Sequence, residues 1–397
     1  MSSLSEVCKL IVDCPHSTAR NEGEGYPLIR TPNIGKGRFN LENVHRVSEE
    51  IYNIRNTRAV PQDDDLILAR EAPAGNVAII KNGDKFCLGQ RTVLIRPDKG
   101  KVNPDFLVYY LLSPEQQNKL LSQANGSTVD HVNLPIIRNL QLSLPPLPVQ
   151  QRIASILSVY DDLIENNQKH IKLLEEAAQR LYKEWFVDLR FPGHESVKIV
   201  DGVPEGWKIK KIEELADTMS GGTPTRSHEE YYSSGEILWL KTKELNDGFI
   251  FDTEEKITEA GLKNSSAKLF EKGCIILAMY GATIGRLGIS SVTMCCNQAC
   301  CVLKIKEIFL FEYVYLWLVN NREMLISRGR GSAQSNLSQE LIKQIEVRIP
   351  SDGVLIKFSN VVDKLLKNKE ILEKQISSLR EARDRLLPKL MSGEIEV

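Results

Sequence analysis

The sequence has no surplus of charge of either sign. Its 397 residues carry 51 Lys and Arg against 52 Asp and Glu, so the net charge is −1. This balance excludes a general polycation, and any binding of nucleic acid must depend on locally clustered charge. The N-terminus lacks an apolar core of signal-peptide length, and the longest apolar runs, FLVYYLL and CIILAMY, are too short to span a membrane. We therefore expect a cytoplasmic protein.

The sequence also lacks the spacings of a disulfide framework or a metal site. Eight cysteines in a chain of this length do not form a recognisable framework. The run CCNQACC (Cys295–Cys301) has no paired C-x-x-C spacing and no histidine nearby, and the six histidines are scattered. Because this run lies in an alternating, strand-like stretch, we interpret its cysteines as small core side chains and predict no metal.

Motifs for catalysis or cofactor binding are missing as well. Pro145-Pro146 is flanked by Leu144 and Leu147, whereas a DNA amino-methyltransferase needs a polar residue before such a pair and an aromatic residue after it. The glycines of YGATIGRLG match neither phosphate-binding pattern and lie between two strand-like runs, which predicts a hairpin turn. The sequence therefore predicts no catalytic residues and no cofactor.

An internal repeat is the main positive feature. A shift of 205 residues places Phe106 on Phe311 and Pro145 on Pro350, and it needs no gap from there into the following helical stretch. Each copy contains a globular domain of mixed helices and strands, then prolines that end a strand, then a long helix. We predict an α/β (α+β) fold with two similar domains. The predicted domain boundaries are 1–147 and 192–350, and the predicted long helices are 148–191 and 351–397.

Both long helices carry apolar residues spaced four and three residues apart, which is typical of a coiled-coil seam. One such helix cannot bury its stripe alone, so we expect the two helices to pair antiparallel. The predicted seam of the first helix comprises Ile153, Leu157, Tyr160, Ile164, Asn167, Ile171, Leu174, Ala178, Leu181 and Trp185. That of the second comprises Phe358, Val362, Leu365, Lys369, Leu372, Ile376, Leu379, Arg383, Leu386 and Leu390.

Polar residues interrupt the seams, and aromatic residues end the first helix. Asn167, Lys369 and Arg383 either fix the register as buried polar groups or lie near solvent, and the sequence does not decide between these alternatives. Trp185, Phe186 and Met391 form either an exposed partner-binding patch at the helix ends or a plug under a neighbouring domain.

Several motifs resemble the specificity subunit of type I restriction–modification systems. They are LPPLPVQQRIASIL, LYKEWFVD, AMYGATIGRLGI followed by NQA, GLKNSSAKLFEKG and RLLPKLMSGEI, and with the repeat they span nearly the whole chain. The resemblance implies two target-recognition domains that each read half of a split double-stranded DNA site. It also implies two helices that set the gap and dock two modification (methyltransferase) subunits, with restriction (motor-nuclease) subunits joining later. The subunit itself would have no catalytic activity. The sequence departs from the family pattern at IPSDGV, where the family favours PPLxEQ.

Polar side chains in duplicated positions are the candidate DNA contacts. Glycine-rich and amide-rich stretches before the last strand of each domain, and the strand-then-turn segments LIRTPNIGKGRF and LWLKTKELNDGF, offer groups for phosphates and base edges. We interpret SRGRGSAQSN as a loop between a helix and a strand. Surface without function is the alternative for all of these residues, and arginines such as Arg70 and Arg91 could instead brace a carboxylate such as Glu71. The predicted DNA-binding residues are Arg30, Asn33, Lys36, Arg38, Arg70, Arg91, Ser127, His131, Lys241, Thr242, Lys243, Asn246, Arg286, Arg328, Arg330, Ser332, Gln334 and Asn336.

Two other classes of protein remain as alternatives. A self-contained methyltransferase or nuclease would need a cofactor or metal site, and the sequence offers neither. A coiled-coil adaptor whose domains bind proteins would show no DNA sequence preference, and the near-neutral charge is compatible with it.

Overall fold

The computed structural model describes residues 1–122, 131–200, 202–330 and 336–397. It divides into a first unit, Met1–Asn166 with Ser377–Val397, and a second unit, Asn167–Ile376. Among the described residues, no helix is both long enough and apolar enough to cross a membrane.

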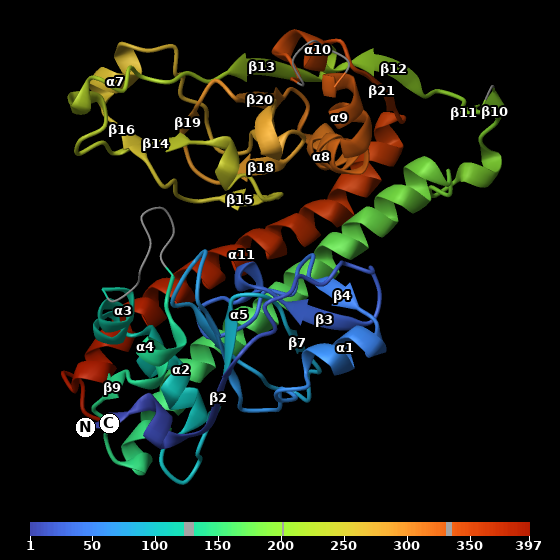
Figure 1. Cartoon of the computed structure of the whole chain (residues 1–397). Coiled ribbons are helices and arrows are strands. Elements are labelled where there is room, and N and C mark those ends of the chain that lie inside the picture. The colour runs from blue at the N-terminus through green and yellow to red at the C-terminus, as the bar shows by residue number, and fades with distance from the viewer. Residues whose placement is uncertain (123–130, 201, 331–335) are drawn as a thin grey trace. The chain divides into compact units, whose positions relative to one another are not determined.

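The first unit is built on an antiparallel four-stranded sheet of order β2-β8-β5-β6 (Figure 1). Leu66 to Ala69 of β5 are all buried, as a central strand of apolar residues between two covered faces should be. A smaller sheet, β4-β3-β7, and the pair β1-β9 complete the strands described here. The strands are β1 (Ser2–Ser3), β2 (Cys8–Asp13), β3 (Tyr26–Ile29), β4 (His45–Val47), β5 (Leu66–Ala69), β6 (Val77–Ile79), β7 (Cys87–Leu88), β8 (Thr92–Pro97) and β9 (Gln141–Leu142). The helices before the long one are α1 (Glu49–Arg55), α2 (Pro104–Leu112), α3 (Pro114–Leu121) and α4 (Leu134–Arg138).

The second unit repeats this plan. Its main sheet has the order β13-β20-β17-β18-β15, in which the first four strands correspond to β2-β8-β5-β6 and pair antiparallel in the same way. Its strands are β10 (Ile199–Val200), β11 (Val203–Pro204), β12 (Lys208–Lys211), β13 (Ala216–Ser220), β14 (Ile237–Leu240), β15 (Gly248–Ile250), β16 (Lys256–Ile257), β17 (Ile275–Ala278), β18 (Leu287–Ser290), β19 (Cys295–Cys296), β20 (Cys300–Ile305) and β21 (Glu346–Ile349). Its short helices are α6 (Ile212–Leu215), α7 (Glu259–Lys263), α8 (Phe311–Asn320), α9 (Arg322–Arg330) and α10 (Gln339–Lys343). The predicted repeat of a mixed fold is therefore confirmed, and so is the predicted hairpin turn between β17 and β18.

The cysteine-rich run forms strands, as the alternation of its residues predicted. Cys295, Cys296, Cys300 and Cys301 are buried in β19 and β20. Burial raises the pKa of Cys295 and of Cys301 to about 12, so these thiols stay protonated at neutral pH. The described part of the chain holds no group of three or more His, Cys, Asp or Glu residues that could bind a metal.

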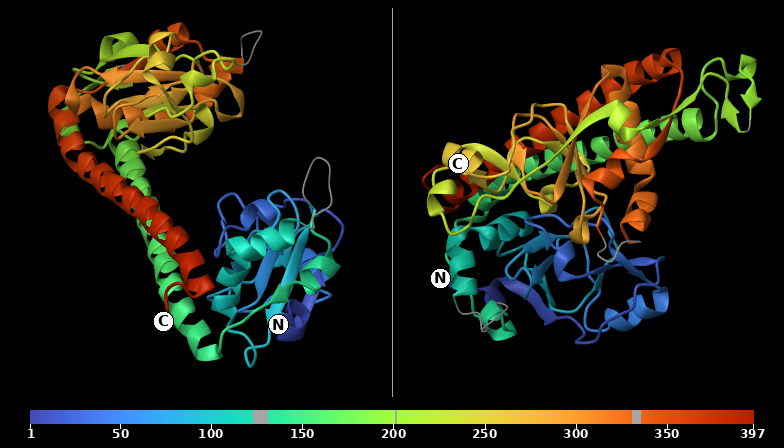
Figure 2. Two further views of the ribbon diagram at one scale, coloured as in Figure 1. Left: turned by 90° about the vertical axis from the view of Figure 1, so that its left-hand side faces the viewer. Right: turned by 90° about the horizontal axis from the view of Figure 1, so that it is seen from above.

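Two long helices contribute to both units. These are α5 (Leu147–Tyr182), with a π-helical turn at Lys183–Val187, and α11 (Asp352–Ser392). In each unit the segments of α5 and α11 that belong to it lie side by side and run antiparallel (Figure 2). Every predicted seam side chain is buried or half-buried.

The polar seam residues are enclosed by partners. Asn167 is 8% exposed and donates from Nδ2 to Oε1 of Gln375 at 3.2 Å. Lys369 is 2% exposed, and its Nζ lies 2.6 Å from Oε1 of Glu175. Burial alone would lower the pKa of Lys369, but the neighbouring Tyr315 and Glu175 outweigh burial and raise this pKa. For these residues the structure favours buried polar contacts over exposure to solvent.

The end of α5 decides between two alternatives that the sequence left open. Trp185 and Phe186 are each only 9% exposed, and the Phe186 ring centroid lies 4.7 Å from that of Phe358 and 4.8 Å from that of Tyr313. The π-helical turn places both side chains in the apolar core of the second unit, so of the two alternatives the structure favours the plug and not the exposed partner-binding patch. Met391 is half-buried against the core of the first unit.

Phe358 is central to this aromatic cluster and is fully buried. We expect Phe358→Ala to lower the free energy of unfolding by about 3–5 kcal/mol, because it leaves a cavity among three rings. Ile356→Ala, at a 46% exposed position on the same helix, should change it by less than about 0.5 kcal/mol. Urea titration followed by circular dichroism measures both, and equal losses would contradict this account.

Candidate nucleic-acid interface

Four chain segments meet at one edge of the first unit, and main-chain hydrogen bonds hold them together. Arg70, after β5, donates from N to the Arg91 carbonyl at 2.8 Å, and Val132 donates from N to the Arg70 carbonyl at 3.0 Å. Gly89 donates from N to the Ile29 carbonyl at 2.7 Å, which brings the end of β3 to the same place. We call this arrangement the first edge. It comprises Arg30, 70–76, 89–91 and 131–132.

The second unit contains the same frame. Met279 donates from N to the Ala299 carbonyl at 2.8 Å, Leu337 to the Met279 carbonyl at 2.7 Å, and Asn297 to the Leu240 carbonyl at 2.9 Å. These bonds match those of the first edge one for one. We call this arrangement the second edge. It comprises Lys241, 279–286, 297–299 and 336–337.

Charged side chains dominate the first edge. The Glu71 carboxylate contacts the guanidinium of Arg91, at 2.8 Å, and Nδ1 of His131. Nε2 of His131 lies 2.8 Å from Nη2 of Arg70, whose Nε donates to the Val132 carbonyl at 2.8 Å. The structure thus brings Arg70, Arg91 and His131 together, and Glu71 connects them.

Two arginines of the first edge, Arg91 and Arg30, have guanidinium N–H groups that donate to no described residue and are still free to form hydrogen bonds. The side chain of Arg91 is 58% exposed although one guanidinium nitrogen contacts Glu71. Its φ of 64° lies in the left-handed region that side chains other than glycine rarely adopt. Among the described residues, Arg30 Nε is one of the few buried polar atoms without a hydrogen-bond partner. Such strain and such an unsatisfied donor are typical of functional sites.

Besides Lys241 and the exposed Arg286, the second edge carries uncharged polar groups. The Tyr280 hydroxyl donates to the Gln298 carbonyl at 2.8 Å, and Tyr280 forms a β-bridge with the half-exposed Asn336. The Gln298 side chain contacts the hydroxyl of Thr223. Met279 and Ala299 stand where the first edge has Arg70 and Arg91, so the same frame carries different side chains.

The segment containing Arg328 corrects an expectation. Ser327 to Arg330 belong to helix α9 rather than to a loop. A Cβ at Gly329 would lie 2.9 Å from Cδ1 of Ile284, so this glycine permits close packing of the helix rather than a turn. Arg328 is exposed on this helix. The predicted residues Ser127, Ser332 and Gln334, and the side chain of Arg330, lie outside what the structure describes.

Two predicted contacts in the first unit have structural partners. Asn33 is 4% exposed, accepts from the Arg30 N–H at 3.1 Å and donates to the Asn40 carbonyl at 3.1 Å. Arg38 donates from Nη2 to Oδ1 of Asp162 on α5 at 2.9 Å. Asn33 is buried and used inside the unit, so its assignment as a DNA contact is corrected. Arg38 keeps one guanidinium nitrogen, Nη1, without a hydrogen-bond partner in the part of the chain that the structure describes, and its contact with DNA stays a prediction.

The predicted residues around Lys241 differ in exposure. Lys241 pairs with Glu255, its Nζ lies 5.6 Å from the Trp239 ring centroid, and its side chain is 18% exposed. Lys243 pairs with Glu254 but stays 58% exposed. Of the remaining predicted residues, Asn246 and Arg286 are exposed and Thr242 is half-exposed.

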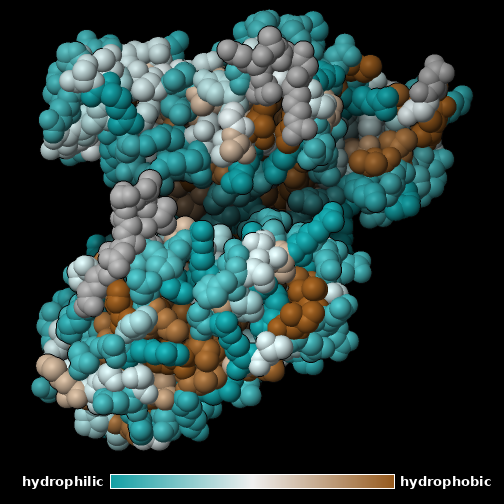
Figure 3. Space-filling model, viewed as in Figure 1, coloured by the Kyte–Doolittle hydropathy of each residue, from teal (hydrophilic) through white to brown (hydrophobic). Residues whose placement is uncertain are grey.

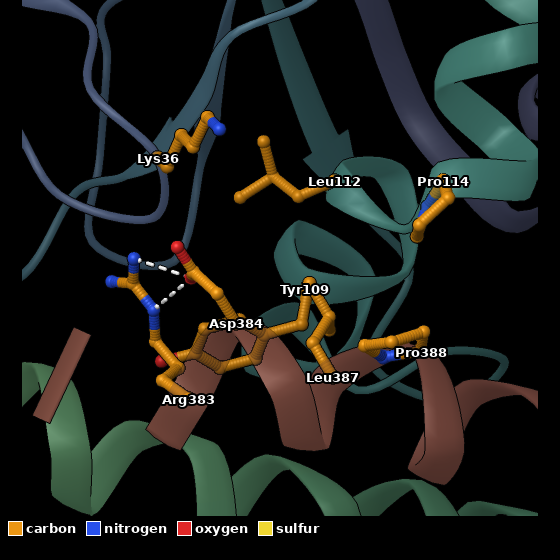
Figure 4. A pocket seen from close by; sticks show the side chains of 8 residues that line it. All are labelled: Lys36, Tyr109, Leu112, Pro114, Arg383, Asp384, Leu387 and Pro388. Carbon is orange, nitrogen blue, oxygen red and sulfur yellow. Dashed lines mark hydrogen bonds and ion pairs between the residues drawn. The ribbon is translucent and has the colours of Figure 1, made fainter. Parts of the chain in front are cut away.

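Lys36 is exposed and lines a cavity of ≈ 160 Å³ in the first unit (Figure 4). The close-up shows Arg383 beside Asp384, with hydrogen bonds of 2.9 and 3.0 Å between them, near Lys36. The remaining walls of the cavity come from Tyr109, Leu112, Pro114, Leu387 and Pro388.

The face of the molecule in Figure 3 is mostly hydrophilic, with apolar residues gathered in patches.

Sequence reasoning missed three side chains of the edges and treated Glu71 only as a possible brace. The missed residues are Gln90, Tyr280 and Gln298. Aligning LGQRTVLI with CCNQACCVLKI pairs Gln90 with Gln298, which is the signal that could have found two of them.

Known proteins share this organisation. A family model described as type I restriction modification DNA specificity domain matches residues 1–176 and 204–380. The MjaIX specificity subunit of Methanocaldococcus jannaschii is 28% identical over 340 residues, which cover 84% of this chain and 78% of that protein. The HindI specificity subunit of Haemophilus influenzae is 24% identical over 410 residues, covering 85% and 88%. A crystal structure of a type I restriction-modification S subunit from M. genitalium has a TM-score of 0.60 at 18% identity and covers 98% of this chain and 95% of that one, which shows a shared fold.

Glu71 connects the charged side chains of the first edge, so we expect Glu71→Gln to destabilise the protein. Hydrogen bonds to charged groups contribute about 1.5–3 kcal/mol each, and this substitution weakens two of them. Glu115→Gln, at a 69% exposed side chain, should change the free energy of unfolding by less than about 0.5 kcal/mol. Denaturant titration compares them, and a loss no larger than that of the control would show that the network does not order the edge.

Proposed function

The chain belongs to the type I restriction modification DNA specificity family, and from that premise we propose that it selects the DNA sequence on which a type I restriction–modification complex acts. Each unit reads one part of a bipartite double-stranded site through its edge. The observation that carries this proposal is one main-chain frame, present twice, that holds Arg70, Glu71 and Arg91 in one unit and Met279, Tyr280 and Ala299 in the other. The globular domains are those predicted from the sequence, 1–147 and 192–350.

The chemistry of the edges suggests which bases they favour. Arginine pairs bidentately with guanine, whereas the amides of Asn and Gln pair with adenine. The exposed Arg91 therefore suits a G·C pair, and the second edge, with Asn336 and Gln298, suits an A·T pair. Arg30, Arg328 and Lys243 add positive charge that suits phosphates.

Partners complete the complex in this proposal. The paired helices α5 and α11 set the spacing between the two parts of the site and dock two modification subunits, and restriction subunits join them. These partners supply much of the phosphate contact, which accounts for a net charge of only −1. Catalysis belongs to the partners, and this chain supplies selection alone.

Substitutions at the two edges should affect different parts of the DNA site. We expect Arg91→Ala to cost about 1–3 kcal/mol of binding and to relax one base position in one half of the site. Asn336→Ala should do the same in the other half, and each variant is the matched control for the other. Mapping of methylated sites with the modification partners measures this. Changes in the same half from both variants, or in neither, would contradict the assignment of one edge to each half.

The purified chain should show no methyl transfer of its own, because catalysis lies with its partners. Incubation with labelled S-adenosylmethionine and mixed DNA should give no more label than a protein-free control, whereas adding the modification partners should give site-specific label. Label incorporated by the chain alone would favour a self-contained enzyme. A partnered complex that ignores DNA sequence would favour the adaptor.

A further inference from the structure

The helix pair carries a buried ion pair in each unit, and the two pairs are unlike. In the first unit, Asp161 is 2% exposed, contacts the guanidinium of Arg383 and accepts from the Tyr109 hydroxyl at 2.6 Å. In the second unit, Lys369 is 2% exposed, pairs with Glu175 at 2.6 Å and lies 3.7 Å from the carboxylate of Glu373 on its own helix. In the first pair α5 supplies the buried acid, whereas in the second pair α11 supplies the buried base.

The internal repeat shows that neither pair has a counterpart in the other unit. The 205-residue shift maps Asp161 onto Leu366 and Arg383 onto Ala178, which are both buried in the apolar core of the second unit. The same shift, reversed, maps Lys369 onto the buried Ile164. The seams are alike in their apolar residues and differ in their buried charges.

We infer that these two unlike ion pairs select the partner of each long helix. They favour pairing of α5 with α11 over pairing of either helix with a second copy of itself. Because the repeats are alike, α5 could otherwise pair with α5 of a second chain in the same register. Asp161 would then lie opposite Ala178 of the second copy and would lose its ion pair with Arg383. A buried charge that loses its partner is strongly unfavourable.

The same comparison excludes pairing of α11 with itself. Arg383 would lie opposite Leu366 of a second copy, and Lys369 would lie opposite Arg380, a like charge. Only the combination of one α5 with one α11 keeps both ion pairs between the helices, Asp161 with Arg383 and Lys369 with Glu175. The buried charges therefore favour an assembly in which each α5 is paired with an α11. This conclusion does not depend on what the edges bind.

Stability alone does not account for these pairs. Replacing a buried ion pair by apolar residues of similar volume is often neutral or stabilising, and the second unit already uses Leu366 and Ala178 at the positions equivalent to the first pair. Buried polar groups on coiled-coil seams are best established as determinants of register and partner. Selection of the partner helix is the role that the positions of these charges support.

The test measures contact between two copies of α5 in the full-length protein. His170 is exposed on α5, and the shift maps Gln375, the partner of Asn167, onto it. In a pair of α5 helices, residue 170 of one copy would therefore lie on the neighbouring helix, offset by less than one turn (~5.4 Å) along the axis from residue 170 of the other. The axes of two packed helices are about 8–10 Å apart, which a short cross-linker can span. His170→Cys with a short bismaleimide cross-linker then reports this pairing as a covalent dimer on a denaturing gel. The parent without this substitution gives the background from native cysteines.

Two variants remove the selection to different extents. Arg383→Ala removes the cation opposite Asp161. This carboxylate then faces an alanine whether α5 pairs with α11 or with a second copy of α5. A second variant largely installs the residues that the repeat has at equivalent positions, and it combines Tyr109→Phe, Asp161→Leu, Lys369→Ile, Glu373→Gln and Arg383→Ala. Arg385→Ala, at a side chain that is 78% exposed on the same helix, is the matched control.

All of these proteins also carry His170→Cys. Cross-linking through residue 170 should be low with His170→Cys alone and with added Arg385→Ala. It should be several-fold higher with added Arg383→Ala and at least about ten-fold higher in the combined variant. Circular dichroism confirms that each variant is folded. If the combined variant does not fold, Arg383→Ala against Arg385→Ala decides the question. Folded variants that cross-link no more than the parent, or a parent that cross-links as much as the variants, would overturn the inference.

Discussion

Apolar side chains that recur four and three residues apart can leave water only against a second helix with the same spacing. In this protein that requirement joins α5 to α11, and each unit depends on the result. The core of the first unit includes Leu157 from α5 and Leu390 from α11. The core of the second unit includes Ala178 from α5 and Phe358 from α11. The long helices are therefore walls of both cores, and the sheets have no complete apolar face to pack on without them.

The edges show how one fold presents two different surfaces. Their segments are joined by main-chain N–H and C=O groups, which every residue except proline carries in full. The frame therefore tolerates Arg70 in one unit and Met279 in the other without losing a bond. Glu71 and Tyr280 then fix different neighbours on the same frame. A constant backbone with variable side chains is the arrangement that a protein needs if it is to read different sequences with a common scaffold.

Local pattern made the repeat, the strands and the helix pair predictable from the sequence, because spacing alone decides which face of a helix or strand is apolar. The partners of individual polar side chains were not predictable, because they come from distant parts of the chain. Arg38 meets Asp162 on a helix 124 residues later, and Arg70 meets His131 61 residues later. Trp185 and Phe186 were ambiguous for the same reason, since their burial depends on Phe358. Gly329 misled because glycine marks turns more often than it marks close packing.

The first unit is assembled from both ends of the sequence, and this affects the order of folding during synthesis. Residues 1–166 leave the ribosome before the second unit, but Leu390, which lies in the same core as Leu157, is made after it. Until then the seam of the N-terminal half of α5 has no α11 segment to cover it. The second unit, which is continuous from Asn167 to Ile376, has its whole sequence available earlier. The unit that begins first is thus completed last, and its exposed apolar stripe is a transient site for chaperones or for aggregation.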